Sequence, residues 1–325
     1  MVSHRTIIKR GNRIYLYVGD RWYYYDESSQ PIGSGAMGVV YLGYSCEGND
    51  RVAIKRVIDR YANIPSIRER ARLEASLMFR HHNLVEMLGY CELQSSTGPI
   101  FIVSRYVQGV NIDRYVESIP RTLLRVQKIC RMLYPVLDAL DYIHSKGIVH
   151  MDIKPSNIMV ENSCNIRLMD LGIASVDDHI IAGESTSVAL MGTPKYAAPE
   201  QFGNKNYKGA LDSSTDIFEF GITLYELLSG SNPFEARNIN EALKKRKTTV
   251  LPYSKGIPRK VVDVLRKATA FEQSKRYKTA GELKIALEHA LRKKSKPVIP
   301  VMLAVSIGIF IISFIIVLLT ILFLL

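Results

Sequence analysis

The chain has 325 residues, of which 23% are charged and 47% are hydrophobic, a balance that excludes a globally disordered protein. Basic residues exceed acidic ones by 12, and the whole excess lies in residues 241–297, where 17 basic side chains accompany 5 acidic ones. Residues 298–325 contain no charged residue. Because ~20 apolar residues already cross the ~30 Å core of a bilayer, the composition argues against a wholly soluble protein and predicts a transmembrane helix at 298–325.

The basic residues indicate what lies next to this apolar segment. Arg292-Lys293-Lys294-Ser295-Lys296 directly precedes it, an order typical of the cytoplasmic side of a membrane helix. We therefore expect a basic juxtamembrane segment at 291–297, a single-pass tail anchor, and a folded region at the cytoplasmic face. A nucleic-acid-binding protein would need a basic stripe with interleaved aromatics, so anionic lipid is the expected partner and nucleic acid is not. The Lys244–Lys247 cluster is expected either to be solvated or to reach the same lipid surface.

Four cysteines are spread widely along the chain, at Cys46, Cys91, Cys130 and Cys164. They form neither a CxxC pair nor a cluster with histidine, so we expect reduced thiols in a cytosolic compartment and no zinc site.

In chain order, the predicted elements change from strands to helices. Residues 13–26 are rich in strand-forming aromatics around Gly19-Asp20, which predicts a hairpin within a strand-rich extension at 1–29. Further strands are expected around 39–41, 52–54 and 100–103, interrupted by one helix at 67–80. Longer helical patterns follow, at 123–144 and 217–228. This order predicts an α+β fold over 30–290, with a small β-rich lobe before a larger helical one.

A glycine-rich motif opens the predicted β-rich lobe. Gly33-Ser34-Gly35-Ala36-Met37-Gly38-Val39-Val40 fits G-x-G-x-x-G-x-V. This spacing also opens dinucleotide-binding units, but those continue into a helix, whereas the strand-like Val39-Val40-Tyr41-Leu42 follows here. Glycines between two strands indicate a flap whose backbone N–H groups can lie over phosphates.

A lysine follows at the end of the next predicted strand, Val52-Ala53-Ile54-Lys55. Alone it could simply reach the surface, but beside a glycine flap it predicts a cation for the α- and β-phosphates. Such a lysine needs an acidic partner. Glu74, on the helix predicted at 67–80, is the first choice and Glu69 the second.

The strongest local signal is His150-Met151-Asp152-Ile153-Lys154-Pro155-Ser156-Asn157, set between apolar flanks. Asp152 can orient a hydroxyl proton, and Lys154 can neutralise a phosphoryl group in transfer. Asn157 and Asp170, which follows the strand-like run 166–169, offer oxygen ligands to Mg²⁺.

Two later segments complete the pattern. Gly192–Glu200, which reads GTPKYAAPE, comes before an apolar helix opened by Asp216. Together, six ordered motifs resemble the eukaryotic-type protein kinase family over about residues 30–290, with the nearest likeness to bacterial membrane Ser/Thr kinases.

The resemblance implies the roles of individual residues. The glycine motif becomes the loop over ATP, Lys55 the phosphate-binding lysine paired with Glu74, and Asp152 the catalytic aspartate assisted by Lys154. Asn157 and Asp170 would hold Mg²⁺, or Mn²⁺ in its place. Glu200 would pair with Arg276. The remaining contacts to ATP would come from Ile32, Gly33, Ser34, Gly35, Ala36, Met37, Gly38, Val40, Ala53, Ser104, Arg105, Val107 and Met159.

Four departures from the family pattern remove no catalytic group. Met151 stands where many of these kinases have arginine, and Leu171 stands where phenylalanine is usual. Ser104 falls at the gatekeeper position and Arg105 where an acidic residue is common. The expected function is ATP- and Mg²⁺-dependent phosphorylation of Ser/Thr in protein substrates at a membrane. The alternative is a membrane-anchored pseudokinase scaffold.

Overall fold

The structure, a computed structural model, describes residues 6–34, 38–57, 59–62, 65–92, 98–122, 124–162, 164–170, 194–202, 210–236, 239–292 and 301–324. The chain divides into two compact units, Met1–Ala290 and Leu291–Leu325. The first unit contains the strands and most of the helices.

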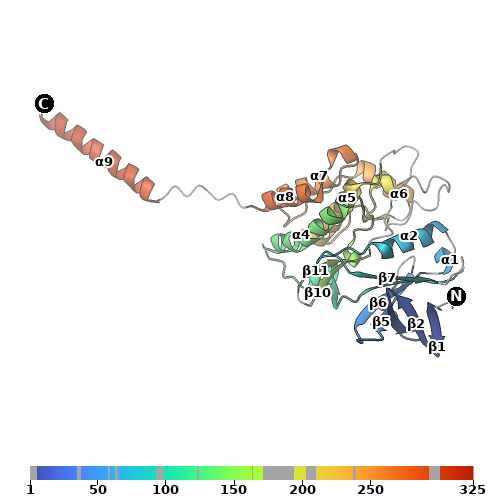
Figure 1. Ribbon diagram of the computed structural model, residues 1–325. Coiled ribbons are helices and arrows are strands. Elements are labelled where there is room, and N and C mark those ends of the chain that lie inside the picture. The colour runs from blue at the N-terminus through green and yellow to red at the C-terminus, as the bar shows by residue number, and fades with distance from the viewer. Residues whose placement is uncertain are drawn as a thin grey trace. The chain divides into compact units, whose positions relative to one another are not determined.

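The first unit begins with an eight-stranded antiparallel sheet (Figure 1). Its strand order is β1-β2-β3-β5-β6-β8-β7, with β4 paired to β5. The strands are β1 (Ile7–Arg10), β2 (Arg13–Val18), β3 (Arg21–Asp26), β4 (Gly33–Ser34), β5 (Gly38–Ser45), β6 (Arg51–Val57), β7 (Met87–Glu92) and β8 (Ile100–Arg105).

The predicted aromatic hairpin near the N-terminus is confirmed as β2 and β3, which pair with Val18 opposite Arg21. Gly19 and Asp20 form the two-residue turn, and both have positive φ, at 52° and 67°. Positive φ at both positions is what a type I′ turn requires, and its twist matches that of the strands. The extension also continues the first sheet, because β3 pairs with β5.

The extension curls over one face of the sheet until its start meets β7. Thr6 Oγ1 donates to Glu92 O at 3.2 Å, and the Cys91 thiol donates to Thr6 O at 3.1 Å. A Cβ added at Gly89 would lie 2.7 Å from a methyl of Val18, so β2 and β7 are in close contact there. The core enclosed in this way contains Ile14, Leu16, Val18, Tyr23, Tyr25, Val52, Ile54, Cys91, Phe101 and Val103.

Helix α1 (Asp59–Ala62) and helix α2 (Pro65–Ser76) follow β6. The C-terminal boundary of the helix predicted at 67–80 is wrong, because α2 ends at Ser76. Beyond it, Phe79 packs edge-on against Tyr142 of the next lobe, with ring centroids 5.8 Å apart. Tertiary packing therefore overrides the helical pattern of the last residues.

A small sheet and short helices connect the β-rich lobe to the helical one. The sheet has the order β11-β10-β9. Its strands are β9 (Gly109–Asn111), β10 (Ile158–Glu161) and β11 (Ile166–Leu168). The helical lobe contains α3 (Ile112–Glu117), α4 (Arg125–His144), α5 (Ser213–Ser229), α6 (Ile239–Thr248), α7 (Arg259–Ala268) and α8 (Ala280–Leu291). Single turns of 3₁₀-helix occur at Pro155–Asn157, Pro199–Phe202 and Gln273–Lys275.

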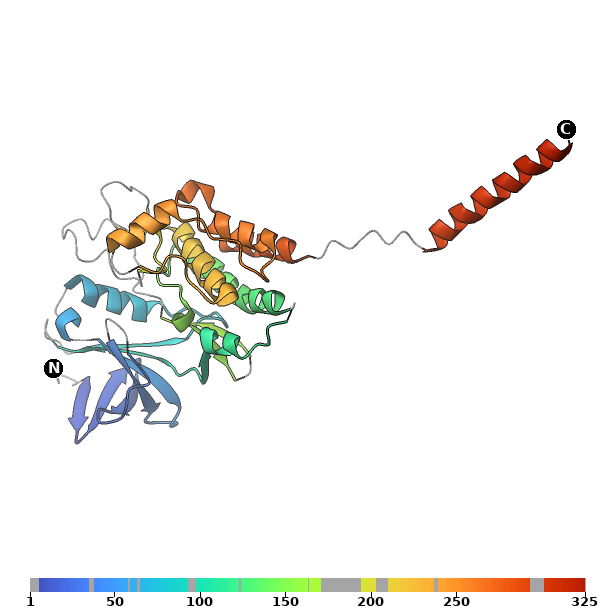
Figure 2. The same ribbon diagram turned by 180° about the vertical axis from the view of Figure 1, so that it is seen from behind.

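Helices α4 and α5 lie side by side at the centre of this lobe in both views (Figures 1 and 2). Their contact includes His144 Nε2, 2.7 Å from Asp216 Oδ2. Helix α5 begins with a capping box at Asp212 and ends at Gly230, whose φ of 79° closes the helix. The two-lobed α+β prediction is confirmed, with the helices placed close to where the sequence pattern put them.

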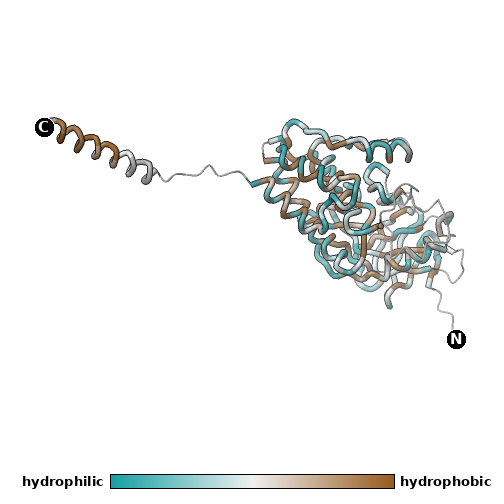
Figure 3. The backbone as a smooth tube through the Cα atoms, turned by 90° about the horizontal axis from the view of Figure 1, so that it is seen from above, coloured by the Kyte–Doolittle hydropathy of each residue, from teal (hydrophilic) through white to brown (hydrophobic). Residues whose placement is uncertain are grey.

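The second unit contains helix α9 (Val301–Leu324), whose described side chains are mainly large and apolar (Figure 3). Among the residues that the structure describes, no helix is both long and apolar enough to span a membrane. The transmembrane helix predicted at 298–325 is therefore not confirmed.

Candidate active site

The backbone of the His150–Asn157 loop is held by one buried carboxylate of α5. Asp216 accepts hydrogen bonds from the backbone N–H groups of His150, at 2.8 Å, and Met151, at 2.7 Å. His144 contacts the same carboxylate from the end of α4. Hydrogen bonds to an ionised acceptor are about twice as strong as neutral ones, so this arrangement fixes the start of the loop against both central helices.

The His150 ring links the loop to the residues before Asp170. Its Nε2 donates to Met169 O at 3.1 Å, and the ring is fully buried. Burial lowers the pKa of His150, which favours the neutral ring. A neutral ring that donates to a backbone carbonyl serves as a structural link between the two parts of the site.

Asp152 lies at the centre of a close polar cluster. Its Oδ2 is 2.6 Å from Lys154 Nζ and accepts from Asn157 Nδ2 at 3.0 Å. The same amide donates to Asp152 O at 2.9 Å. Met151, just before it, has a left-handed φ of 62°, a conformation that costs a non-glycine residue ~1–2 kcal/mol. Strain of this kind is typical of sites where the surrounding structure dictates the backbone.

Strands β10 and β11 bring Asp170 and Asn157 to the same place. Met169 N donates to Asn157 O at 2.8 Å, directly before Asp170. Asp170 Oδ1 lies 4.0 Å from Nζ of Lys55, which projects from β6 of the other lobe. The lysine and the aspartate that the motifs predicted therefore meet across the two lobes.

The oxygen atoms of this site suit a magnesium ion bound to phosphates. Mg²⁺ prefers one or two protein carboxylates or amides together with phosphate oxygens and water, and Asn157 and Asp170 offer one ligand each. No group of three His, Cys, Asp or Glu residues gathers into a metal cluster in the described part of the chain. The donor set therefore fits a metal that arrives with its nucleotide.

The described ends of the glycine motif lie in the paired strands β4 and β5, as its strand flanks predicted. Gly33 pairs with Val40, and Ser34 with Val39. A Cβ at Gly38 would lie 2.8 Å from Arg56 O, so the neighbouring strand leaves room only for glycine. Gly35, Ala36 and Met37 lie outside the described residues.

The residues predicted to surround the adenine lie on neighbouring strands. Val40 is opposite Lys55, and Ala53 is opposite Ser104. Met159 lies on β10, opposite Asn111. The predicted hinge follows Ser104: Arg105 is exposed and pairs with Glu86 at 3.3 Å, and Val107 is half-buried. Ile32 is exposed directly before β4, and its backbone N–H donates to Val40 O.

The predicted acidic partner of Lys55 is only partly described. Glu74 lies in α2, and its side chain is outside the described residues. Glu69, the second choice, is exposed. The residue that sequence reasoning missed here is Arg68, which is buried and pairs with Glu92 of β7 at 2.8 Å, fastening α2 to the sheet. Arg68 lies three residues before Ala71, on the same face of the helix, and Ala71 is also buried. This spacing was the available signal that Arg68 faces inward.

The predicted pair between Glu200 and Arg276 is confirmed. Two hydrogen bonds of 2.7 and 2.9 Å join the groups, and both side chains are fully buried. Arg276 also donates to Ser214 O at 3.0 Å, which ties the pair to the start of α5. The C-terminal end of the Gly192–Glu200 motif is thus anchored to the helical lobe. Leu171, Gly172 and Thr193 lie outside the described residues.

Arg246 corrects the prediction for the Lys244–Lys247 cluster. It is 2% exposed and donates to Ala197 O at 2.9 Å and Pro194 O at 2.7 Å. Burial lowers its pKa to about 9, and its guanidinium stacks on Phe234, 4.7 Å from the ring centroid. The cluster is therefore not one solvated or lipid-facing surface, because its arginine turns inward and supports the 194–198 segment.

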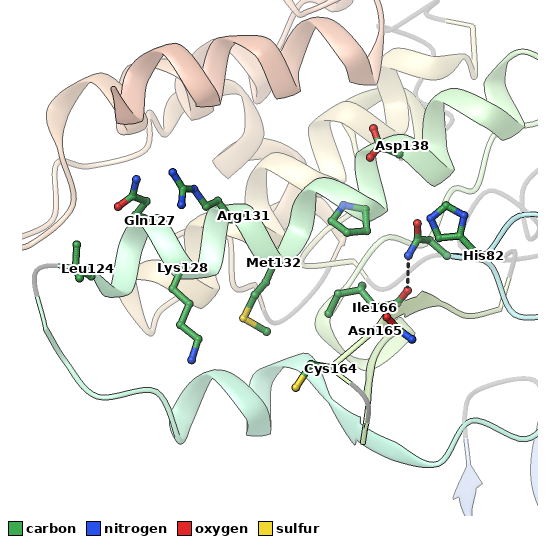
Figure 4. A pocket seen from close by; sticks show the side chains of 12 residues that line it. His82, Leu124, Gln127, Lys128, Arg131, Met132, Asp138, Cys164, Asn165 and Ile166 are labelled. Atoms are coloured by element: carbon green, nitrogen blue, oxygen red, sulfur yellow. Dashed lines mark hydrogen bonds between the residues drawn. The ribbon is translucent and has the colours of Figure 1, made fainter. Parts of the chain in front are cut away.

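A separate cavity of about 690 Å³ lies along α4 and the turn between β10 and β11 (Figure 4). Lys128, Arg131 and Met132 line it from the helix, and Cys164 from the turn. Its lining includes none of the polar side chains around Asp152, so it is distinct from the candidate site.

The comparisons with known proteins agree with this geometry. Residues 26–290 match the family model described as "Protein kinase domain". The chain is 31% identical to CBL-interacting serine/threonine-protein kinase 5 of Arabidopsis thaliana, over 67% of this chain and 48% of that protein. It is 34% identical to the probable serine/threonine-protein kinase PknB of Corynebacterium glutamicum, over 68% of this chain and 33% of that protein.

A third relative and a solved structure are also similar to this chain. The chain is 30% identical to serine/threonine-protein kinase PrkC of Bacillus subtilis, over 80% of this chain and 39% of that protein. It therefore spans between a third and a half of the length of these curated relatives. The PknI kinase domain of Mycobacterium tuberculosis has the same fold, with a TM-score of 0.63 at 22% identity, over 89% of this chain and 100% of that one.

Proposed function

The chain belongs to the protein kinase family, and from this premise we propose that it transfers the γ-phosphate of ATP to Ser or Thr hydroxyls of protein substrates. The observation that carries the proposal is the grouping of Asp152, Lys154 and Asn157, with Lys55 and Asp170 meeting beside it. These are the charges that phosphoryl transfer requires, because catalysis there depends mainly on positioning and on neutralising charge. The names of the curated relatives support Ser/Thr specificity.

Each side chain then has a defined task. Asp152 orients the substrate hydroxyl and accepts its proton, and Lys154, 2.6 Å from that carboxylate, neutralises the phosphoryl group in transfer. Asn157 and Asp170 hold the metal, and Lys55 binds the α- and β-phosphates with Glu74 as its proposed partner. Mg²⁺, when bound with ATP, supplies further neutralisation of the phosphate charge.

ATP is proposed to lie between the lobes, under the Gly33–Gly38 motif. Val40 and Ala53 cover the adenine from the sheet and Met159 from β10, while the backbone at 105–107 supplies its hydrogen bonds. Gly33, Ser34 and Gly38 bring backbone close to the phosphates, as do the proposed contacts Gly35, Ala36 and Met37.

The proposal is tested by incubating the full chain with labelled ATP, Mg²⁺ and a general protein substrate. We expect label on serine and threonine after acid hydrolysis of the substrate. A chain that binds ATP but labels neither itself nor the substrate would instead be the pseudokinase scaffold. Label on tyrosine alone would contradict Ser/Thr specificity.

Ser104 gives a specific expectation for the adenine site. It lies opposite Ala53 and Met87, and we propose that its small side chain leaves space behind the base. Ser104→Met should weaken the binding of adenine analogues with a bulky substituent by about 10- to 200-fold, the effect of filling a pocket by a methylene or more. Competition binding measures this loss.

The matched control is Ser118→Met, which adds the same side chain at an exposed position after α3. It should leave the affinity for the analogues unchanged. Equal affinities in Ser104→Met and the wild type would show that Ser104 does not face the adenine.

We also propose that residues 298–325 attach the chain to a membrane, with the kinase domain at the cytoplasmic face and the lysines of 291–297 near anionic lipid. The support comes from the sequence: 28 uncharged residues follow directly after a basic run. The full chain should float with neutral vesicles even at high salt, because apolar attachment is insensitive to screening. A chain ending at Lys296 should need anionic vesicles and low salt. If both chains behave alike, residues 298–325 are no anchor.

A further inference from the structure

An acidic side chain lies inside α5, a helix most of whose residues are buried, beneath the catalytic loop. Glu219 is 1% exposed, and its neighbours on α5, Phe218 and Phe220, are fully buried. A carboxyl group is costly in such a place unless polar groups meet it. Its Oε2 accepts a hydrogen bond of 2.7 Å from Ile153 N, the backbone donor directly after Asp152.

Gln201 links Glu219 to two further segments. Its Oε1 accepts from Ala198 N at 2.5 Å, and its Nε2 donates to Met151 O at 2.9 Å. Its side chain also interacts with the Glu219 carboxyl and opposes the rise in the pKa of that group. One amide therefore joins the end of the 194–198 segment, the catalytic loop and the buried acid.

These contacts enclose Asp152 from both sides along the chain. Met151 O is held by Gln201, and Ile153 N is held by Glu219. Thr223, one turn further along α5, donates to Ile153 O at 3.0 Å. Because Met151 has left-handed backbone, the loop depends on outside contacts to keep the Asp152 carboxylate in place.

The 194–198 segment is held from its other side by Arg246. The guanidinium donates to the carbonyls of Pro194 and Ala197, while Gln201 accepts from Ala198 N. The segment is thus fixed at three backbone atoms, and the contact at Ala198 continues through Gln201 into the catalytic loop.

We propose that Glu219 and Gln201 are positioning residues that couple the 194–198 segment to Asp152, so that phosphoryl transfer depends on one buried network. The coupling rests on the proposed protein kinase function for its catalytic consequence, but the network itself can be measured without catalysis. Neither residue touches the reacting atoms; both act through the backbone on either side of Asp152.

Because the neutral form of Glu219 is favoured, glutamine is the substitution that best preserves its contacts. Burial, followed by the neighbouring carboxylates of Asp216 and Asp152, raises the pKa of Glu219, while the hydrogen bonds from Ile153 N and Gln201 act in the opposite direction. Arg246, on α6, is the cation that interacts with it. With the pKa raised, the neutral acid is favoured, and Glu219→Gln keeps both its shape and an acceptor for Ile153 N.

Kinetics of full-chain variants test the coupling. Glu219→Leu should lower kcat by about 10- to 100-fold, because small displacements of a catalytic group have effects of that size. It should leave the KM for ATP unchanged, because neither residue contacts the proposed nucleotide site. Glu219→Gln should restore kcat to within about threefold of the wild type. Leu224→Ala, which opens a cavity in the same helix, should lower Tm without this change in kcat.

The double variant Glu219→Leu/Gln201→Leu separates coupling from two independent defects. Residues that act as one unit are non-additive, so the double variant should lose little more kcat than the worse single one. Multiplicative losses, or equal kcat in Glu219→Leu and Glu219→Gln, would overturn the proposal.

Hydrogen–deuterium exchange reads the network directly. Exchange in peptides covering 150–154 and 194–198 should accelerate in Glu219→Leu and Gln201→Leu, and stay unchanged there in Glu219→Gln. Unchanged exchange in the leucine variants overturns the proposal whether or not the chain is active. If exchange responds as expected but the wild type transfers no phosphate, the network stands and the proposed function fails.

Discussion

Replacing Asp152 with Asn is expected to slow phosphoryl transfer by about 10²- to 10⁴-fold, the usual contribution of a positioned acid or base. The variant keeps the shape of the side chain, so Asn157 and the backbone contacts of the loop can persist. It removes the negative charge that faces Lys154 at 2.6 Å and the oxygen that takes up the hydroxyl proton. ATP affinity should remain within about threefold of the wild type, because the nucleotide is bound by other groups.

Single-turnover kinetics and nucleotide titration of the same preparation measure these two quantities. Asp50→Asn, the same change at an exposed position before β6, serves as the control and should alter neither. Wild-type turnover in the Asp152 variant would show that another group accepts the proton. A parallel loss of ATP affinity would show that Asp152 acts on the nucleotide site instead.

Replacing Arg276 with Met should lower the free energy of unfolding by about 3–5 kcal/mol, the range found when a buried ion pair loses one partner. The Glu200 carboxylate would remain fully buried without the two hydrogen bonds that compensate its charge. The guanidinium also contacts the Phe218 ring, 4.7 Å from its centroid, so packing is lost as well. Urea unfolding measures the loss.

Lys275→Met tests the adjacent residue, whose pair with Glu272 is exposed, and should change stability by no more than about 0.5 kcal/mol. Combining Arg276→Met with Glu200→Gln removes the orphaned charge, and the double variant should be more stable than the sum of the single losses predicts. Strict additivity would mean that the two residues stabilise the protein separately.

The fold was largely predictable because local and global signals agree in this chain. Gly19 and Asp20 supply the backbone that a tight hairpin needs, and the alternation of Ile14, Leu16 and Val18 with tyrosines specifies which face of β2 is buried. The end of α2 was not predictable, because it depends on a ring contact between Phe79 and Tyr142, 63 positions later (142 − 79).

The site was predicted wherever a residue acts within a short motif. Asp152, Lys154 and Asn157 lie within six residues, so their proximity follows from the chain itself. The contacts of Arg246 lie 49 and 52 positions away, at Ala197 and Pro194. Within the sequence it looked like one cation in a basic run, although its spacing of four from the buried Ala242 was a sign that it faces inward.

Glu219 shows a second limit to what can be predicted from the sequence. Its neighbours indicate a buried helix, and an acid in that position signals an unidentified polar partner. The partner, a backbone N–H of the catalytic loop, has no sequence signature. Only the assembled structure shows that this acid lies beneath Asp152.

The closure of the N-terminal extension has a consequence for the order of folding during synthesis. Its links join Thr6 to Cys91 and Glu92, 85 and 86 positions away. Contacts so distant in sequence form slowly, because the loop between them must close first. Strands β1–β3 leave the ribosome before β7 and β8, so their apolar inner face stays uncovered until those two strands have been made. At ~5–20 residues per second, the nascent chain therefore exposes this surface for several seconds, a period in which chaperone binding has its greatest effect on the yield of folded protein.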